Sequence, residues 1–328
     1  MNSHKTKVNK KGLFAAGGAL AAAASIFLGT FGEIAPTTAN LAPKQSAPQL
    51  LAKKQDGITI VFPTRKDAPN LQIQANKVAN FLSKDLGITV KAQISDETAA
   101  VEALRRNSVD IAFLSSRPAL KAEELANARL HLGEIRAKYS GRYTYCSVFL
   151  VPKNSSLRTM GDRKATLAQL RGKKMAFTSP TSSSGFLYPT SELIKYKLVP
   201  NREGLDRFFG QVAYGGDYTK AIMEVVRGRA DVAAVSEYAQ YPPYITDADR
   251  NKLRVLYKIC GVPAHGVVFN DEIPVVLREK IIKALLKLNK PENNDLLKGL
   301  YNSTELVRID HNRHLQLVRE AVKNLGMD

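Results

Sequence analysis

The chain has 328 residues, and its 48 lysines and arginines outnumber its 30 aspartates and glutamates, which gives a formal net charge of +18. The basic residues are scattered, tryptophan is absent, and no run of basic and aromatic residues offers a surface for stacking bases. This composition argues against nucleic-acid binding. The five histidines show no metal-ligand spacing within a suitable motif, so we expect neither a metal nor another cofactor.

The first 39 residues have the pattern of a secretory signal peptide. Basic residues between Lys5 and Lys11 precede the apolar run Leu13–Phe31, and small residues follow at Thr37–Ala39. We expect cleavage near Ala39. The alternative is an uncleaved membrane tether, because the apolar run is nearly long enough to span a bilayer. Residues 40–56 lack apolar periodicity and are expected to form a flexible linker.

The folded part is expected to begin at Gly57 with alternating strands and helices. Strands are predicted at 58–62, 88–93 and 109–116. A first helix is predicted between the first two strands, with Ile73, Val78, Phe81 and Leu82 on one face, and a second helix is predicted at 99–106. This alternation is typical of a parallel sheet.

A second set of elements repeats the first. Strands are predicted at 174–178, 210–213 and 230–237, with a helix after a serine-rich loop and another at 219–227. The sequence around residues 226–236 resembles that around residues 104–115. This internal similarity predicts an α/β protein with two like lobes, each a mostly parallel sheet flanked by helices.

Two extended apolar segments, at 143–152 and at 253–269, are expected to cross between the lobes and form a two-strand hinge. Helices at 274–288 and 311–325 are expected to return to the first lobe. The expected boundaries are 57–145 for the first part of lobe 1, 146–260 for lobe 2, and 261–328 for the crossover strand and the return to lobe 1. Facing sheet edges would then form a ligand cleft.

The two cysteines, Cys146 and Cys260, are too few for a disulfide framework. Each lies at a predicted crossover, where an oxidising compartment would permit one bridge if the Cα atoms lay within about 7 Å. Two buried thiols that act as small apolar side chains are the simpler interpretation, and the bridge is the alternative.

The segment Ser179–Pro189 contains the residues best suited to hold an anion. It joins a short strand to a helix through Ser182, Ser183, Ser184 and Gly185. A helix start has unpaired amide groups and a partial positive charge, and serine hydroxyls add donors. The alternative is that these serines only cap the helix.

Several segments carry a resemblance to a known family. They are residues 167–177, 182–189, 214–218 and 225–235 and the Leu-Gly-Met-Asp ending. From residue 57 onward the chain resembles the substrate-binding proteins of bacterial ABC importers for phosphonate, phosphite and phosphate. The resemblance implies a two-lobed, type II-like periplasmic binding protein that is not an enzyme, that holds a phosphorus oxyanion and that delivers it to a membrane permease.

The same resemblance implies which residues bind the ligand. The serine loop implies contacts from Ser182, Ser183 and Ser184. Tyr218 occupies a position where the family often has a histidine, and Glu237 matches the acidic residue that commonly ends the last strand of lobe 2.

Two further candidates lie where the chain departs from the family pattern. Arg117 follows a lobe 1 strand where the family usually has an aromatic residue, and it offers a bidentate partner for an oxyanion. His265 ends the segment 261–265, which lacks the acid that aminophosphonate binders tend to carry there. We therefore expect phosphite, phosphate or a short alkylphosphonate to be preferred over an aminophosphonate.

Two other functions remain open from the sequence. An exported serine hydrolase or phosphatase would need a base beside a serine, and His265 is the only histidine on the predicted cleft edge. The chain has no G-x-S-x-G motif. A periplasmic sensor for the same anion would have the same fold and site as an importer subunit.

Overall fold

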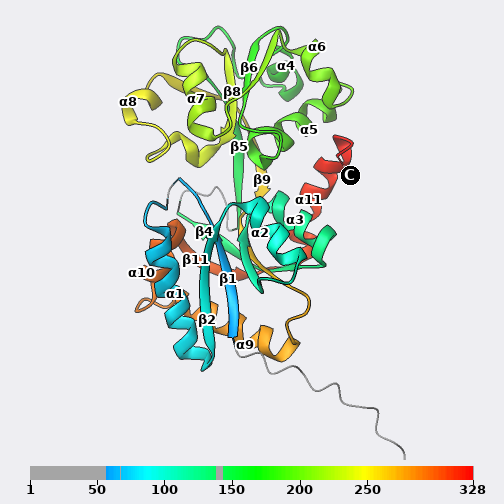
Figure 1. Cartoon of the computed structure of the whole chain (residues 1–328). Coiled ribbons are helices and arrows are strands. Elements are labelled where there is room, and N and C mark those ends of the chain that lie inside the picture. Colours follow the sequence, from blue (N-terminus) through cyan, green and yellow to red (C-terminus); the bar gives the residue numbers. More distant parts are fainter. Residues whose placement is uncertain (1–56, 67, 138–142, 328) are drawn as a thin grey trace, which may run out of the picture. The chain divides into compact units, whose positions relative to one another are not determined.

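The structure is a computed structural model that describes residues 57–66, 68–137 and 143–327 (Figure 1). The predicted signal peptide and linker lie outside these residues. The described residues belong to one compact unit. Within this part of the chain, no helix is both long enough and apolar enough to cross a membrane.

The first lobe is built on a six-stranded sheet with the order β11-β4-β10-β3-β1-β2. Its strands are β1 (Gly57–Pro63), β2 (Thr89–Ser95), β3 (Ile111–Leu114), β4 (Arg129–Arg136), β10 (Gly266–Phe269) and β11 (Ser303–Arg308). Strand β1 pairs in parallel with β2 and β3, whereas β10 is antiparallel to β3 and β4, and β11 is antiparallel to β4. The sheet is therefore mixed, which corrects the expectation of a mostly parallel one.

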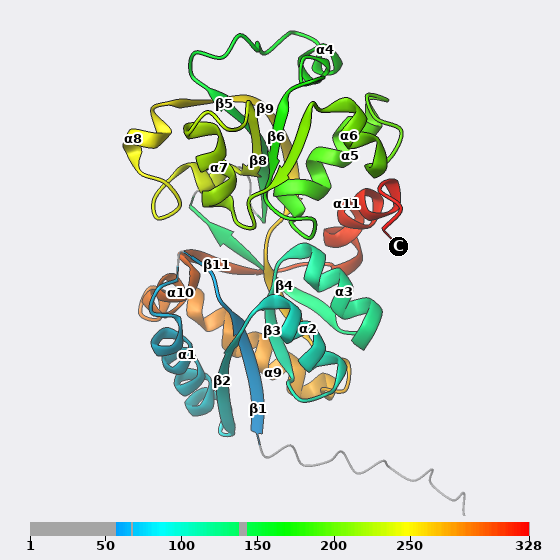
Figure 2. The ribbon, with the colours of Figure 1, turned by 45° about the horizontal axis from the view of Figure 1, so that its top comes forward.

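Helices flank this sheet (Figure 2). They are α1 (Leu71–Leu86), α2 (Glu97–Arg105), α3 (Ser116–Ala126), α9 (Val275–Leu286), the short turn η4 (Lys287–Asn289) and α10 (Asn294–Tyr301). Helix α1 buries residues spaced three or four apart, such as Leu71, Ala75 and Val78, and ends at Gly87, whose φ of 68° is left-handed. Ile73 is 58 % exposed, so the prediction that it faces the core is wrong.

The second lobe is built on a five-stranded sheet with the order β7-β6-β8-β5-β9. Its strands are β5 (Thr144–Pro152), β6 (Lys174–Phe177), β7 (Gln211–Tyr214), β8 (Val232–Ser236) and β9 (Leu253–Pro263). The helices and turns of this lobe are α4 (Arg163–Ala168), η1 (Ser183–Leu187), α5 (Tyr188–Lys195), η2 (Arg202–Gly204), α6 (Leu205–Phe208), α7 (Tyr218–Val226), η3 (Glu237–Gln240) and α8 (Asp247–Arg250).

The predicted internal repeat is confirmed. In lobe 1 the parallel strands lie in the order β2-β1-β3, and in lobe 2 the parallel strands lie in the equivalent order β7-β6-β8. In each lobe the repeat begins with the strand that lies between the other two, β1 in lobe 1 and β6 in lobe 2, and this strand leads into a helix. The two-lobed α/β fold follows from this repeat, with antiparallel strands added to each sheet.

The chain passes between the two sheets twice, from β4 to β5 and from β9 to β10. Strands β5 and β9 pair antiparallel, with Thr144 opposite Pro263, and a disulfide joins Cys146 to Cys260. The interpretation as two buried thiols is therefore wrong, because the pairing of the strands brings their Cα atoms within 4.0 Å.

The last helix, α11 (His311–Asn324), was expected to return to lobe 1. It contacts β4 and α3 of lobe 1, and also α5 and η1 of lobe 2. The Asn324 amide donates to the Ser191 hydroxyl of α5 at 3.3 Å. Helix α11 thus packs against both lobes, which corrects that expectation.

Candidate functional site

The serine-rich loop joins β6 to α5 through a single π-helical turn, η1. The Ser182 hydroxyl accepts a hydrogen bond from the Gly185 amide at 3.0 Å and caps this turn. A Cβ atom at Gly185 would lie 2.1 Å from Thr178 Oγ1, so the close approach requires glycine. Pro189 lies at the start of α5, where a missing amide hydrogen costs little.

The next two serines have partners outside the loop. Ser183 Oγ lies 3.1 Å from Ser116 Oγ, at the start of helix α3 in lobe 1. Ser184 Oγ lies 2.8 Å from the Tyr218 hydroxyl. The loop therefore does more than cap its own helix, because two of its hydroxyls reach other elements.

A cavity of about 630 Å³ lies against this loop and is lined by both lobes. Lobe 1 contributes residues that include Arg65, Glu97 and Ser115, and lobe 2 contributes residues that include Ser182, Ser183 and Tyr218. Lys66 Nζ donates to Thr219 Oγ1 at 2.8 Å, which is a second hydrogen bond from lobe 1 to lobe 2 beside the cavity.

Most of the predicted contact residues line this cavity. They are Ser182, Ser183, Tyr218, His265 and Arg117. Ser184 is fully buried and is not among the lining residues, but its hydroxyl contacts that of Tyr218, which lines the cavity.

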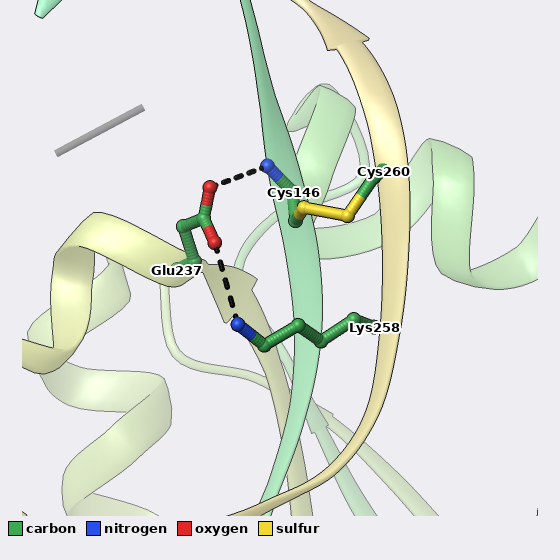
Figure 3. The surroundings of a disulfide bond; sticks show 4 residues. All are labelled: Cys146, Glu237, Lys258 and Cys260. Atoms are coloured by element: carbon green, nitrogen blue, oxygen red, sulfur yellow. Dashed lines mark hydrogen bonds and ion pairs between the residues drawn. A yellow bond between two sulfur atoms is a disulfide. The ribbon is translucent and has the colours of Figure 1, made fainter. Parts of the chain in front are cut away.

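Glu237 lies elsewhere (Figure 3). Its Oε1 accepts a hydrogen bond from the Cys146 amide at 2.9 Å, and its Oε2 lies 3.7 Å from Lys258 Nζ. The chain turns into η3 after β8 and directs this carboxylate to the paired strands β5 and β9. Glu237 is thus held beside the disulfide and is not among the residues that line the cavity, and its contact with a ligand stays a prediction.

Arg117 lines the cavity but is already held by other groups. Its Nη2 donates to the Met327 carbonyl at 3.3 Å, and its Nη1 lies 3.7 Å from Glu124 Oε1. These contacts use only part of the five N–H donors of the guanidinium.

His265 lies between β9 and β10 and is only 7 % exposed. Within the described part of the chain, its Nδ1 has no hydrogen-bond partner. Burial, together with the nearby charges of Arg65 and Arg136, lowers the pKa of His265 well below its usual value. This shift favours the neutral imidazole, in which one ring nitrogen donates and the other accepts a hydrogen bond.

Arg65 was not predicted to contribute to the site. It follows β1, and its guanidinium pairs with the buried carboxylate of Glu134 at 3.1 Å and lies 3.8 Å from the centroid of the Tyr301 ring. The feature of the sequence that could have identified Arg65 is its position in a polar loop at the carboxyl end of a central parallel strand, because ligands bind at that end in such sheets.

A group of tyrosines forms one wall of the cavity: Tyr145, Tyr218, Tyr238 and Tyr244. The centroid of the Tyr238 ring lies 5.5 Å from that of Tyr145, 5.9 Å from that of Tyr218 and 5.7 Å from that of Tyr244. This wall could not be predicted from the sequence, because its tyrosines come from separate elements.

Two serine hydroxyls of the loop contact other hydroxyl groups. The partners of the Ser183 and Ser184 hydroxyls are Ser116 and Tyr218, and over the described residues no histidine bonds to either serine. A nucleophilic serine would need such a base. The same residues contain no group of three or more metal-ligating side chains.

The sequence of the chain is similar to those of known proteins. The chain is 25 % identical over 235 residues to the phosphonates-binding periplasmic protein of Escherichia coli, covering 70 % of this chain and 66 % of that protein. It is 26 % identical over 176 residues to the phosphate-import protein PhnD of Mycolicibacterium smegmatis, covering 53 % of each. The alignments thus span about two thirds and about half of these relatives.

The fold also matches the solved structure of PhnD1 from Prochlorococcus marinus in complex with methylphosphonate, with a TM-score of 0.65 and 19 % identity, over 83 % of this chain and 99 % of that one. Residues 60–314 match the family model described as "ABC transporter, phosphonate, periplasmic substrate-binding protein". Because this match covers most of the sequence, the chain belongs to the family of periplasmic substrate-binding proteins of phosphonate ABC transporters.

Proposed function

We propose that the chain is the periplasmic solute-binding protein of an ABC importer and that it captures a small phosphorus oxyanion in the cavity lined by both lobes. Its ligand is phosphite, phosphate or a short alkylphosphonate. Its protein partner is the membrane permease of that importer. Family membership supports the transport role, and the cavity supports the class of ligand.

The observation that carries this proposal is the contact between two helix starts. Ser183 begins the turn that leads into α5, Ser116 begins α3, and their hydroxyl oxygens lie 3.1 Å apart at the cavity. Helix starts present unpaired amide groups and partial positive charge, which favour oxyanions. The buried Nδ1 of His265 offers a further polar contact in the same cavity.

The ranking of ligands depends on the walls of the cavity. Residues 261–265 contain no carboxylate to hold an amine. The tyrosine wall instead offers an apolar surface for a short alkyl group, and the cavity volume leaves room for one beside the oxyanion.

Calorimetric titration of the chain from residue 40 onward with phosphite, phosphate, methylphosphonate and 2-aminoethylphosphonate tests this proposal. We expect at least one of the first three to bind more tightly than 2-aminoethylphosphonate. A preference for 2-aminoethylphosphonate would overturn the ranking, and no binding of any of the four would overturn the ligand class.

The transport role has a separate test in cells. Deletion of the gene should abolish uptake of the ligand that binds best in calorimetry, and the intact gene should restore it. Normal uptake combined with loss of a transcriptional response to the ligand would identify a sensor instead of an importer subunit.

A further inference from the structure

The buried imidazole of His265 lines the cavity and lacks the kind of partner that the other buried histidines have. His311 Nδ1 accepts a hydrogen bond from the Leu130 amide at 2.9 Å, and His314 Nε2 lies 3.1 Å from the Ala264 carbonyl oxygen. Within the described part of the chain, the Nδ1 of His265 is shut off from solvent and pairs with no polar atom. Because an unpaired polar group is costly to bury, a polar group of a bound molecule at this ring would be favourable.

The charges nearest to this ring are positive. Arg65 and Arg136 lie 3.1 Å and 3.7 Å from the buried carboxylate of Glu134. Burial, together with the charges of these two arginines, lowers the pKa of His265 well below its usual value. A neutral imidazole supplies no negative charge, and the two arginines repel a cation. This part of the cavity therefore suits a neutral polar group better than an ammonium group.

The tyrosine wall connects His265 to the serine turn. The centroid of the Tyr145 ring lies 6.3 Å from that of His265 and 5.5 Å from that of Tyr238. The Tyr238 centroid lies 5.9 Å from that of Tyr218, whose hydroxyl lies 2.8 Å from Ser184 Oγ. Two tyrosine rings thus lie between His265 and Tyr218 along the wall. A ligand whose oxyanion is held at the serine turn would reach His265 with its organic substituent.

The cavity leaves room for such a substituent. The lobes already meet beside it through the contact of Ser183 with Ser116 and the hydrogen bond from Lys66 to Thr219, yet its volume is about 630 Å³. A tetrahedral oxyanion is only a few times larger than a water molecule, whose share of liquid volume is about 30 Å³. An oxyanion alone would therefore leave most of the cavity unfilled.

We propose that His265 selects a hydroxyl group on the organic substituent of the ligand, so that the preferred ligand is a short hydroxyalkylphosphonate. A hydroxyl group both donates and accepts hydrogen bonds, so it can pair with either tautomer of a neutral imidazole. An ammonium group would meet the charges of Arg65 and Arg136, and a methyl group would leave the ring unpaired. This inference rests on the proposed function and narrows its alkylphosphonates to those that carry a hydroxyl group.

The test uses ligands of similar length that differ at the end of the substituent. Propylphosphonate, 2-hydroxyethylphosphonate and 2-aminoethylphosphonate carry a methyl, a hydroxyl and an ammonium group at the same position, and phosphonoacetate carries a carboxylate. Calorimetry at neutral pH measures their affinities, with phosphite and phosphate in the same series, for the wild type, His265→Leu, His265→Gln and His131→Leu. His131 is the matched control, because over the described residues its Nε2 also lacks a partner, but it is not among the residues that line the cavity. Melting temperatures check that the variants fold.

We expect the wild type to bind 2-hydroxyethylphosphonate about three- to tenfold more tightly than propylphosphonate, which corresponds to one neutral hydrogen bond. His131→Leu should keep this preference. His265→Gln should also keep it, because its side-chain amide can donate and accept. A folded His265→Leu variant should bind the two ligands about equally.

A wild type that binds propylphosphonate as tightly as 2-hydroxyethylphosphonate would overturn the inference, whether or not the variants fold. The same holds if 2-aminoethylphosphonate or phosphonoacetate binds most tightly, or if a folded His265→Leu variant keeps the preference for the hydroxyl group. In each of these cases, binding of phosphite, phosphate or propylphosphonate by the wild type would leave the proposed ligand class in place. A wild type that binds none of the six ligands would overturn the proposed function and this inference together.

Discussion

The start of α3 in lobe 1 and the serine turn η1 in lobe 2 each follow a parallel strand, β3 and β6, and their serine hydroxyls meet at the cavity, but the two starts are completed differently. In lobe 2 the turn is capped from within, since the Ser182 hydroxyl accepts from the Gly185 amide. In lobe 1 the residue before the helix, Ser115, donates both its amide and its hydroxyl hydrogen to the carboxylate of Glu97.

This difference suggests a division of roles around one cavity. The lobe 2 turn has only neutral groups, so its partial positive charge remains available to an external anion. The lobe 1 helix start already holds a carboxylate, so a ligand beside it must be compatible with a negative neighbour. If the proposed function holds, we expect the lobe 2 turn to contribute more to the affinity for the oxyanion than the lobe 1 helix start does.

The largest expected effect comes from the disulfide between the strands that connect the two lobes. Replacing Cys146 and Cys260 together by alanine should lower the free energy of unfolding by about 2–4 kcal/mol, because the bond closes a long loop in the unfolded chain. Urea unfolding measures this loss, and mass spectrometry with and without reduction verifies the bond. Because neither helix start contacts the disulfide directly, ligand affinity should change much less than stability, and a greater loss of affinity than of stability would contradict the division of roles.

A smaller loss of stability is expected from Gly185→Ala, which disrupts the lobe 2 turn only. The new Cβ would lie 2.1 Å from Thr178 Oγ1, and that hydroxyl is held by a 3.0 Å hydrogen bond to the Ala234 carbonyl. We expect a loss of about 1–3 kcal/mol in urea unfolding, together with weaker ligand binding. Gly161→Ala is the matched control, since its Cβ would meet nothing within 4 Å. Equal stability of the two variants would contradict this prediction and would mean that the turn shifts to accommodate the new Cβ atom.

The smallest effect is expected from Ser182→Ala, which removes the cap and leaves Ser183 in place. The lost hydrogen bond to the Gly185 amide should cost about 0.5–2 kcal/mol of stability. Ligand affinity should stay within a few-fold of the wild type. A variant that unfolds as the wild type does but binds far more weakly would mean that Ser182 holds the ligand directly.

Much of the fold could be predicted from the sequence because buried parallel strands are short apolar runs between polar loops. Strand β4 was missed, since it contains Arg129, Glu134 and Arg136. Glu134 is buried there because Arg65, distant in sequence, pairs with it at 3.1 Å. The spacing of apolar residues cannot reveal that a distant arginine will pair with a glutamate inside a strand.

For the site, too, contacts between residues distant in sequence could not be predicted. The serine loop could be identified because its chemistry is local: small hydroxyl residues and a glycine between a strand and a helix. The position of Glu237 after β8 does not reveal that its carboxylate accepts a hydrogen bond from the Cys146 amide. Glu97 was missed because an acidic residue at a helix start usually serves only the helix dipole, and its partner Ser115 lies on another element.

The central claim is that the cavity holds a phosphorus oxyanion on the lobe 2 serine turn, and titration of Ser183→Ala tests it most directly. Ser183 lines the cavity, and its hydroxyl contacts Ser116. A hydrogen bond from a hydroxyl to a charged ligand contributes about 1.5–3 kcal/mol, so affinity for the oxyanion that the wild type binds best should fall roughly ten- to hundred-fold. Stability without ligand should fall by about 1–3 kcal/mol, because the buried Ser116 hydroxyl loses its hydrogen-bond partner. A Ser183→Ala variant that binds this oxyanion as tightly as the wild type would contradict the account.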